Sequence, residues 1–474
     1  MAWLRRIWRS HLVFAVLLLA GVLLRLATTF AYRPALMFPD SAYYLSFAQG
    51  RWIPGTARTT AYSVLLRGLL ILQGINLVAV VQHLLGLAMA VAIYVFLLRW
   101  GCARGWAALA TLPVLLDPLQ VVLEHYVLTE VTAEVLVVAA VLILGWPSSD
   151  RPSDPTEPRA GVRLSSSLWG AAIASLLLGL SAVTRSGDLL LGFVVVGFVL
   201  VSRAGWRRRV AQALIAVVAF AAPVVAYATW MDNTRGSFGL TYGYSGHFLY
   251  GRVMAFAGTT GLDLPLAERS LGPLLEPGQR NLSQLMWSPS SPSWTITPAQ
   301  GMTVDQLDGD FARRVITQQP LDYLRTVAGD FLYNFAPTRG LGPERFPNWY
   351  FTFRPGYPAG VAGTQKLVDK YGGTDVGINS VLTRSLHAYG TWWTPGTLLG
   401  VLLLAGLAAV AGVGRARGSG MRLACLLICA ALIGALAAPA LLAGFSVRYL
   451  LPAVALAPLV GVLGLTAITG KGRR

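Results

Sequence analysis

The stretch Phe38-Pro39-Asp40-Ser41-Ala42-Tyr43-Tyr44-Leu45 follows closely after the first long apolar run of the chain, residues 11–31. That run is long enough to cross a bilayer as a helix, and the basic residues before it, among them Arg5 and Arg9, predict a cytoplasmic start. A cleaved signal peptide is the alternative, which the length of the run and the later apolar runs disfavour. We therefore expect Asp40 and its aromatic neighbours where the chain leaves the membrane on the outer side.

The composition is that of a membrane protein. Of the 474 residues, 55% are apolar and only 12% are charged, and the mean hydropathy is +0.58. Continuous apolar runs such as 78–98 recur along the chain, whereas the strands of a membrane barrel would alternate over about ten residues. The sequence predicts an all-α polytopic membrane protein.

The apolar runs predict about ten transmembrane helices with both termini in the cytoplasm. These runs are 11–31, 78–98, 106–116, 127–146, 168–182, 189–201, 210–230, 395–413, 423–442 and 448–466. The formal charge of +17 is concentrated in hydrophilic gaps that this topology places on one side. After the N-terminal arginines, the gaps contain Arg203, Arg207, Arg208, Arg209, Arg415, Arg417, Arg422, Lys471, Arg473 and Arg474. The charge therefore reflects topology, and nucleic-acid binding is not supported.

Three regions are expected. Residues 1–231 form an N-terminal transmembrane module whose first external loop, 32–77, carries Asp40. Residues 232–391 form a small extracytoplasmic domain, because a hydrophilic stretch of this length is too long for a simple connecting loop. One helix is expected within that domain at 303–335. Residues 392–474 supply the C-terminal transmembrane helices.

Three acids are candidates for catalysis. Asp40, flanked by aromatic residues that partly desolvate it, fits a general base that takes a proton from an attacking hydroxyl. The alternative for the same residue is an ordinary helix N-cap. Glu124 and Glu130 flank the start of another span, where a second acid would orient a hydroxyl or help to hold a divalent cation. The alternative for these glutamates is a helix cap or a pair with an arginine.

Four arginines are candidates for holding a lipid phosphate: Arg25, Arg58, Arg185 and Arg448. A guanidinium is always charged and can donate two parallel hydrogen bonds to phosphate oxygens, which suits a phosphate at the edge of a bilayer. The alternative for each arginine is a contact with lipid head groups or a pair with a nearby acid, such as Asp188.

Aromatic residues and histidines near the same face are candidates for substrate contacts. Tyr242, Tyr244, His247 and Arg252 form a strip directly after a span, and the alternative for them is the aromatic belt of a membrane protein. Tyr43, Tyr44 and His125 are further candidates. His125 is expected to form hydrogen bonds rather than bind metal, because no second histidine lies at ligand spacing.

Five motifs, in their order along the chain, resemble the GT-C superfamily of membrane glycosyltransferases, which use sugars linked to polyprenyl phosphate. The motifs are Pro39-Asp40-Ser41-Ala42-Tyr43-Tyr44, Arg58-Thr59-Thr60-Ala61-Tyr62, Leu128-Thr129-Glu130, Val183-Thr184-Arg185 and Arg448-Tyr449-Leu450-Leu451-Pro452. The resemblance implies a catalytic Asp40, with Glu124 or Glu130 as the second acid. It also implies that Arg185 and Arg448 hold the donor phosphate. Many relatives have two adjacent acids in the first loop, whereas Ser41 follows Asp40 here, so a requirement for Mg, Mn or Ca stays open.

The resemblance implies transfer of one sugar from a polyprenyl-phosphate donor to a glycan, lipid or protein acceptor outside the cytoplasmic membrane. The composition, rich in alanine, arginine and glycine, is typical of actinobacteria. In those bacteria, members of the GT-C superfamily transfer arabinofuranose or mannose to envelope polymers. A ligase or polymerase of envelope polysaccharide is an alternative within the enzymes. A transporter or flippase for a lipid-linked saccharide, or a structural subunit, is the alternative outside them.

Overall fold

The computed structural model describes residues 2–50, 53–147, 167–201, 205–298, 300–338, 348–356, 364–371, 376–391, 393–414 and 420–470. The basic residues Arg203, Arg415, Arg417, Lys471, Arg473 and Arg474 lie outside these ranges, so their predicted side of the membrane stays a prediction.

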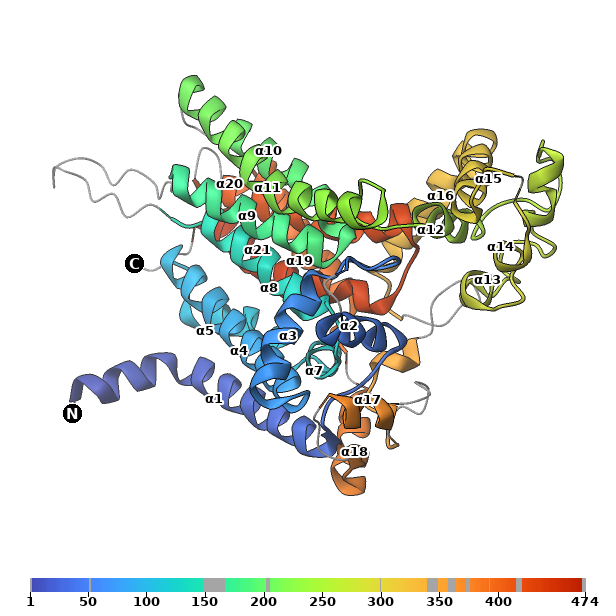
Figure 1. The fold of residues 1–474 in the computed structure, drawn as a ribbon. Coiled ribbons are helices and arrows are strands. Elements are labelled where there is room, and N and C mark those ends of the chain that lie inside the picture. Colours follow the sequence, from blue (N-terminus) through green and yellow to red (C-terminus); the bar gives the residue numbers. More distant parts are fainter. Residues whose placement is uncertain are drawn as a thin grey trace.

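Helices dominate the described chain (Figure 1). The N-terminal part comprises α1 (Ala2–Ala31), β1 (Tyr32–Arg33), α2 (Pro39–Gln49), α3 (Ala61–Gln73), α4 (Asn76–Arg99), α5 (Arg104–Ala110), α6 (Leu112–Leu116), α7 (Pro118–His125), α8 (Glu130–Leu144), α9 (Leu168–Thr184), η1 (Ser186–Leu190), α10 (Leu191–Val201) and α11 (Trp206–Arg235). The remainder comprises α12 (Ser245–Val253), η2 (Leu266–Leu271), α13 (Leu282–Trp287), α14 (Pro292–Thr295), α15 (Val304–Gln318), α16 (Pro320–Tyr333), η3 (Asn348–Phe351), α17 (Thr364–Lys370), β2 (Gly377–Ile378), α18 (Ser380–Tyr389), α19 (Gly396–Val410), α20 (Gly420–Leu442), η5 (Val447–Leu450) and α21 (Leu451–Thr469).

The prediction of an all-α polytopic membrane protein is confirmed. Among the described residues, 5 helical segments are long and apolar enough to cross a membrane: His11–Ala31, Asn76–Arg99, Trp206–Arg235, Gly420–Leu442 and Val447–Thr469. Shorter apolar helices run alongside them, at Ala61–Leu72, Leu168–Thr184, Ser186–Val201 and Gly396–Val410. The total of about ten spans stays a prediction.

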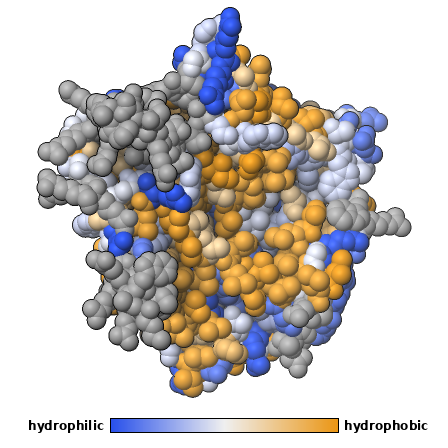
Figure 2. Space-filling view, turned by 90° about the vertical axis from the view of Figure 1, so that its left-hand side faces the viewer, coloured by the Kyte–Doolittle hydropathy of each residue, from blue (hydrophilic) through white to orange (hydrophobic). Residues whose placement is uncertain are grey.

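The surface of the bundle is apolar where lipid would contact it. Leu19 and Leu23 on α1, and Leu214 and Val218 on α11, are all exposed to about half or more of their area. Figure 2 looks onto the end of the bundle at which the start of α1 and the end of α21 lie, and there apolar side chains are seen beside hydrophilic ones. An exposed apolar surface of this extent is unfavourable in water and is expected of a protein in a bilayer.

The described parts of residues 232–391 contact two different regions of the molecule, and the boundaries of the predicted extracytoplasmic domain stay a prediction. Helices α12 to α15 enclose a hydrophobic cluster of their own, which includes Tyr250 and Phe311. The chain then returns to the bundle, because α16 packs on α20 and β2 pairs with β1, Ile378 opposite Tyr32. The single helix predicted at 303–335 is wrong. Two helices, α15 and α16, meet at Pro320, because proline has no backbone N–H and places Gln319 outside the helical region (φ −126°, ψ 53°).

A buried polar network ties α1, α4 and α7 together. Arg25 donates to Glu124 at 2.7 Å, and His83 Nδ1 lies 2.8 Å from the other oxygen of that carboxylate. Gly86 permits this approach, since a Cβ there would collide with Glu124 Oε1. His125 Nε2 must donate to the carbonyl of Tyr32 at 2.6 Å, so His125 Nδ1 accepts from His83 Nε2 at 3.1 Å.

This network predicts a large loss of stability when only one charge of the buried pair is removed. Arg25→Met leaves Glu124 without its cation and should lower the free energy of unfolding by about 3–5 kcal/mol. The double variant Arg25→Met, Glu124→Gln should recover part of the loss, because no uncompensated charge is then buried. Thermal unfolding of the purified protein in detergent measures both.

The control for this experiment is Arg325→Met, whose side chain is 78% exposed and should change stability little. Equal destabilisation in the single and double variants would show that packing, rather than the buried charge, accounts for the loss.

Candidate active site

The N-terminal turn of α2 places Asp40. Phe38 is the N-cap residue and Pro39 begins the helix, so Asp40 lies in the first turn and is not the cap. A carboxylate is favoured there by the helix dipole. Ser41 accepts from the backbone N–H of Phe38 at 2.9 Å and donates to the carbonyl of Val127 at 2.8 Å. Ser41, which stands where many GT-C enzymes have a second acid, therefore links the first loop to the segment before α8 by hydrogen bonds.

Two arginines and a second acid surround Asp40. Arg448 Nη1 lies 3.1 Å from Asp40 Oδ2 and 3.2 Å from Glu130 Oε1, so one guanidinium nitrogen bridges the two carboxylates. Arg58 Nε is 3.5 Å from the same oxygen of Asp40. The side chain of Asp40 is 17% exposed, which leaves it within reach of a ligand. The structure thus brings together Asp40, Glu130, Arg58 and Arg448.

The pKa of Asp40 reflects two opposing effects. Burial alone would raise it, but the guanidiniums of Arg58 and then Arg448 outweigh burial and hold the pKa below its usual range. Burial raises the pKa of Tyr44, and the negative charge of Asp40 raises it further. Asp40 is therefore an ionised carboxylate at neutral pH, and Tyr44 is a neutral phenol.

Aromatic rings hold the arginines in place. Arg448 lies over the rings of Phe38 at 5.2 Å and Tyr449 at 5.1 Å, and Arg185 lies over the same tyrosine ring at 4.6 Å. Arg58 lies over Phe248 at 4.9 Å, on α12. Such contacts orient a guanidinium without neutralising it. Sequence reasoning missed Phe248, because nothing in its local pattern indicates that α12 folds back over the first loop.

Arg185 differs from the other three candidate arginines. Arg25, Arg58 and Arg448 each contact a carboxylate, whereas Arg185 forms no ion pair within the described ranges. Its half-buried guanidinium contacts the ring of Tyr449, and its neighbour Asp188 accepts a hydrogen bond from Ser181. The N–H groups of Arg185 are thus available to an anionic ligand.

The other predicted residues lie in three different places. Tyr43 accepts from the N–H of Ala57 at 2.9 Å and so positions the segment that carries Arg58. Arg25, Glu124 and His125 belong to the buried network and do not reach Asp40. Because Glu124 is occupied there, Glu130 is the second acid that the structure places beside Asp40.

The aromatic and basic strip is divided among separate contacts. The N–H of Tyr242 donates to Thr56 at 2.8 Å, and Tyr244 packs edge-on against His247. His247 is buried on α12 with Asp308 at 3.1 Å. Arg252 pairs with Asp330 of α16 at 2.6 Å. None of these four side chains contacts Asp40 within the part of the chain that the structure describes.

The described residues do not form an evident metal site. No group of three or more His, Cys, Asp or Glu side chains is close enough to hold an ion in the described ranges. The two carboxylates that meet, Asp40 and Glu130, are already bridged by Arg448. Among the described residues no third His, Cys, Asp or Glu side chain accompanies them, and the requirement for a divalent cation stays open.

The buried tie through Ser41 gives a testable expectation. Ser41→Ala leaves the Phe38 N–H and the Val127 carbonyl without their partner and should cost about 1–3 kcal/mol of stability. Ser41→Asp, which restores the two-acid pattern, should cost at least as much, because its carboxylate would face the Val127 carbonyl. Thermal unfolding of the two variants beside Ser46→Ala, an exposed serine of the same helix, measures the difference. Stability equal to that of the Ser46 variant would contradict the tie.

Comparisons with known proteins give structural neighbours only. No family model matches the sequence, and no curated protein is significantly similar to it. The oligosaccharyltransferase AglB from Archaeoglobus fulgidus, solved with an inhibitory peptide and a dolichol-phosphate, aligns at 11% identity and a TM-score of 0.43, over 98% of this chain and 51% of that one. ArnT from Cupriavidus metallidurans, bound to undecaprenyl phosphate, aligns at 17% identity and a TM-score of 0.36, over 95% and 77%.

The chain thus spans about half the length of the oligosaccharyltransferase, 51%. Identities and TM-scores this low do not assign an activity or a substrate to this chain.

Proposed function

We propose that the protein is a GT-C-type glycosyltransferase that moves one sugar from a polyprenyl-phosphate donor to an acceptor hydroxyl outside the cytoplasmic membrane. The observation that carries the proposal is the cluster at the end of the bundle. There an ionised Asp40 lies within 3.5 Å of two arginines, and Arg185 stands nearby without an ion pair in the described chain. A base beside an anion-binding group is what this reaction requires.

In the proposed reaction, the acceptor oxygen forms a bond to the anomeric carbon while its proton passes to a carboxylate oxygen of Asp40. The bond between the anomeric carbon and the phosphate oxygen breaks, and polyprenyl phosphate leaves with the electron pair. The leaving group gains negative charge, which Arg185 and Arg448 are placed to stabilise. Glu130 positions Arg448 through their contact at 3.2 Å.

The donor phosphate would also release the base. A carboxylate paired with two guanidiniums is a weak proton acceptor. A phosphate that binds Arg448 and Arg58 competes with Asp40 for the same N–H groups, and the contact with Arg58, at 3.5 Å, is the longer of the two. Binding of the donor therefore raises the basicity of Asp40 when the acceptor arrives.

The finer assignments belong to the same proposal. Arabinofuranose or mannose is the favoured sugar, and a glycan, lipid or protein is the acceptor. The site faces the outside, and both termini lie in the cytoplasm of a plasma-membrane protein. This orientation is supported by the positions of the described residues in Figure 1, where the start of α1 and the end of α21 lie at the opposite end of the bundle from α2.

Removal of the base should abolish transfer. Asp40→Asn keeps the shape of the side chain and should reduce sugar transfer by at least 10²-fold, as expected for loss of a general base. Binding of the lipid donor should persist, because Arg185 and Arg448 remain. The measurement is transfer by purified protein with a panel of synthetic polyprenyl-phosphate sugars, together with donor binding.

The matched control is Asp322→Asn, whose aspartate is 49% exposed on α16. Transfer that survives in Asp40→Asn would remove Asp40 from the mechanism. Wild-type protein that binds every donor and transfers none would favour the transporter or the structural subunit.

The pH dependence of transfer should report the pKa of Asp40. The base acts when ionised, so kcat/KM falls as pH drops through its pKa, and in the wild type that fall lies below the usual aspartate range. Arg58→Gln removes the largest lowering effect on the pKa of Asp40 and should move the fall to higher pH. The control Arg325→Gln should leave the profile in place, and coincident profiles for all three proteins would exclude Asp40 as the titrating base.

A further inference from the structure

Helix α16 turns three leucines away from the rest of the protein. Leu321, Leu324 and Leu332 are exposed to 64%, 57% and 64% of their area. They lie on one stripe of the helix, which also includes the exposed Ala328, because these positions are spaced by three or four residues. An apolar stripe of this kind is unfavourable in water and indicates a partner that covers it.

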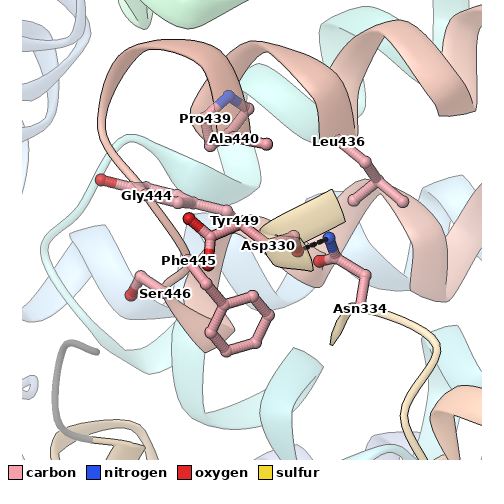
Figure 3. Close-up of a pocket in the computed structure, with 9 residues that line it drawn as sticks. All are labelled: Asp330, Asn334, Leu436, Pro439, Ala440, Gly444, Phe445, Ser446 and Tyr449. Carbon is pink, nitrogen blue, oxygen red and sulfur yellow. Dashed lines mark hydrogen bonds between the residues drawn. The ribbon is translucent and has the colours of Figure 1, made fainter. Parts of the chain in front are cut away.

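The opposite face of α16 packs on the end of a membrane-spanning helix. The hydroxyl of Tyr323 donates to the carbonyl of Leu441, near the end of α20, at 3.2 Å. Leu436, two turns from the end of α20, lines a small hollow together with Asp330 and Asn334 of α16 (Figure 3). Helix α16 therefore lies beside the last two turns of α20, at the same end of the bundle as the candidate site.

The end of α16 also meets α19, another apolar helix of the bundle. A Cβ at Gly400, one turn inside α19, would lie 3.5 Å from the Cβ of Phe335, just past the end of α16. Leu398 and Val401 of the same helix are exposed to 46% and 61% and belong to the surface that the bundle offers to lipid. The end of α16 is therefore at a depth at which α19 already faces lipid.

The charges of α16 are arranged as expected for a helix that enters a bilayer from its surface. In its first half, the side chains of Arg325 and Asp322 are 78% and 49% exposed and lie 3.3 Å apart. Its second half contains one charged residue, Asp330, which points inward and pairs with Arg252 at 2.6 Å. The exposed positions of the second half are thus all apolar. A long side chain such as that of Arg325 can keep its charge among lipid head groups while neighbouring leucines contact hydrocarbon.

We propose that α16 is embedded in the membrane leaflet on the side of the candidate site. Leu321, Leu324 and Leu332 contact lipid chains, and Arg325 lies at the level of the lipid phosphates. The partner of the stripe is the hydrocarbon of the leaflet, not a second copy of this chain. The predicted extracytoplasmic domain is then divided, because α16 belongs to the membrane part of the protein.

This position brings lipid close to the candidate site. Asp330, on the face of α16 opposite to the leucines, lines the same hollow as Tyr449. The ring of Tyr449 contacts Arg185 at 4.6 Å and Arg448 at 5.1 Å. A single helix therefore separates the lipid chains from the arginines that the proposed reaction assigns to the donor phosphate.

Spin labels on α16 test the proposal in the full-length protein in phosphatidylcholine nanodiscs. The native cysteines are buried, so the label reacts with a cysteine introduced at an exposed position. Electron paramagnetic resonance measures collisions of each label with oxygen, which concentrates in hydrocarbon, and with a water-soluble nickel chelate. The reporters are Leu321→Cys, Leu324→Cys and Leu332→Cys, with Ala328→Cys on the same stripe as a replacement should one of them not fold.

Two matched controls define the lipid and the water values. Leu404→Cys, on α19, replaces a leucine that is 63% exposed and gives the lipid value. Arg313→Cys, on α15, replaces a side chain that is 67% exposed and gives the water value. We expect the ratio of oxygen to chelate collisions at Leu332 to match that of the lipid control. The ratio at Leu321 should be lower than at Leu332 and still above that of the water control, because that end of α16 lies nearer to the head groups.

Two outcomes would overturn the proposal. Ratios at all reporters equal to that of the Arg313 control would place the stripe in water. Loss of collisions with both reagents, together with spectral broadening by a second label, would show that another copy of the chain covers the stripe. Neither measurement requires sugar transfer, so the position of α16 is tested even if the protein has no transferase activity.

Discussion

The bridge that Arg448 makes between Asp40 and Glu130 is the contact on which the candidate site depends. It connects the first loop, the start of α8 and η5, which are distant in sequence, through contacts of 3.1 and 3.2 Å. Two carboxylates this close would repel each other without the cation between them. Because the bridge is only partly shielded from solvent, an anionic ligand can compete for Arg448 without unfolding the site.

The buried network makes that bridge geometrically possible. It fixes His125 against Tyr32, and the two flanking segments then exchange backbone hydrogen bonds, from Leu36 N to the carbonyl of His125 at 2.9 Å and from Val127 N to the carbonyl of Leu36 at 3.0 Å. The tie from Ser41 follows directly after them. Asp40 and Glu130 thus lie at one end of a short series of hydrogen bonds, and the Arg25–Glu124 pair lies at the other end. That pair is buried among apolar helices, where an unpaired charge is least tolerated.

Sequence reasoning recovered those features that depend on local pattern. The apolar runs, the position of Asp40 after the first span, and Arg448 opening the last helix all follow from hydropathy and charge. Sequence reasoning did not distinguish Glu124 from Glu130, because both lie near the start of the same span. Only the tertiary contacts show that Glu124 is paired with Arg25. The ring of Phe248 was missed for the same reason. The break at Pro320 was a local signal that the amphipathic pattern on both sides obscured.

An ion-paired base has a consequence for the order of the proposed reaction. Without donor, Asp40 is held by two guanidiniums and has little tendency to take a proton from water or from an acceptor hydroxyl. In the proposed reaction the donor phosphate would draw at least one guanidinium away, so the base would become effective only when a sugar is present to receive the oxygen. Substrate binding and base activation are then a single event, and the electrostatic energy that Asp40 loses is offset by the contacts that the phosphate gains.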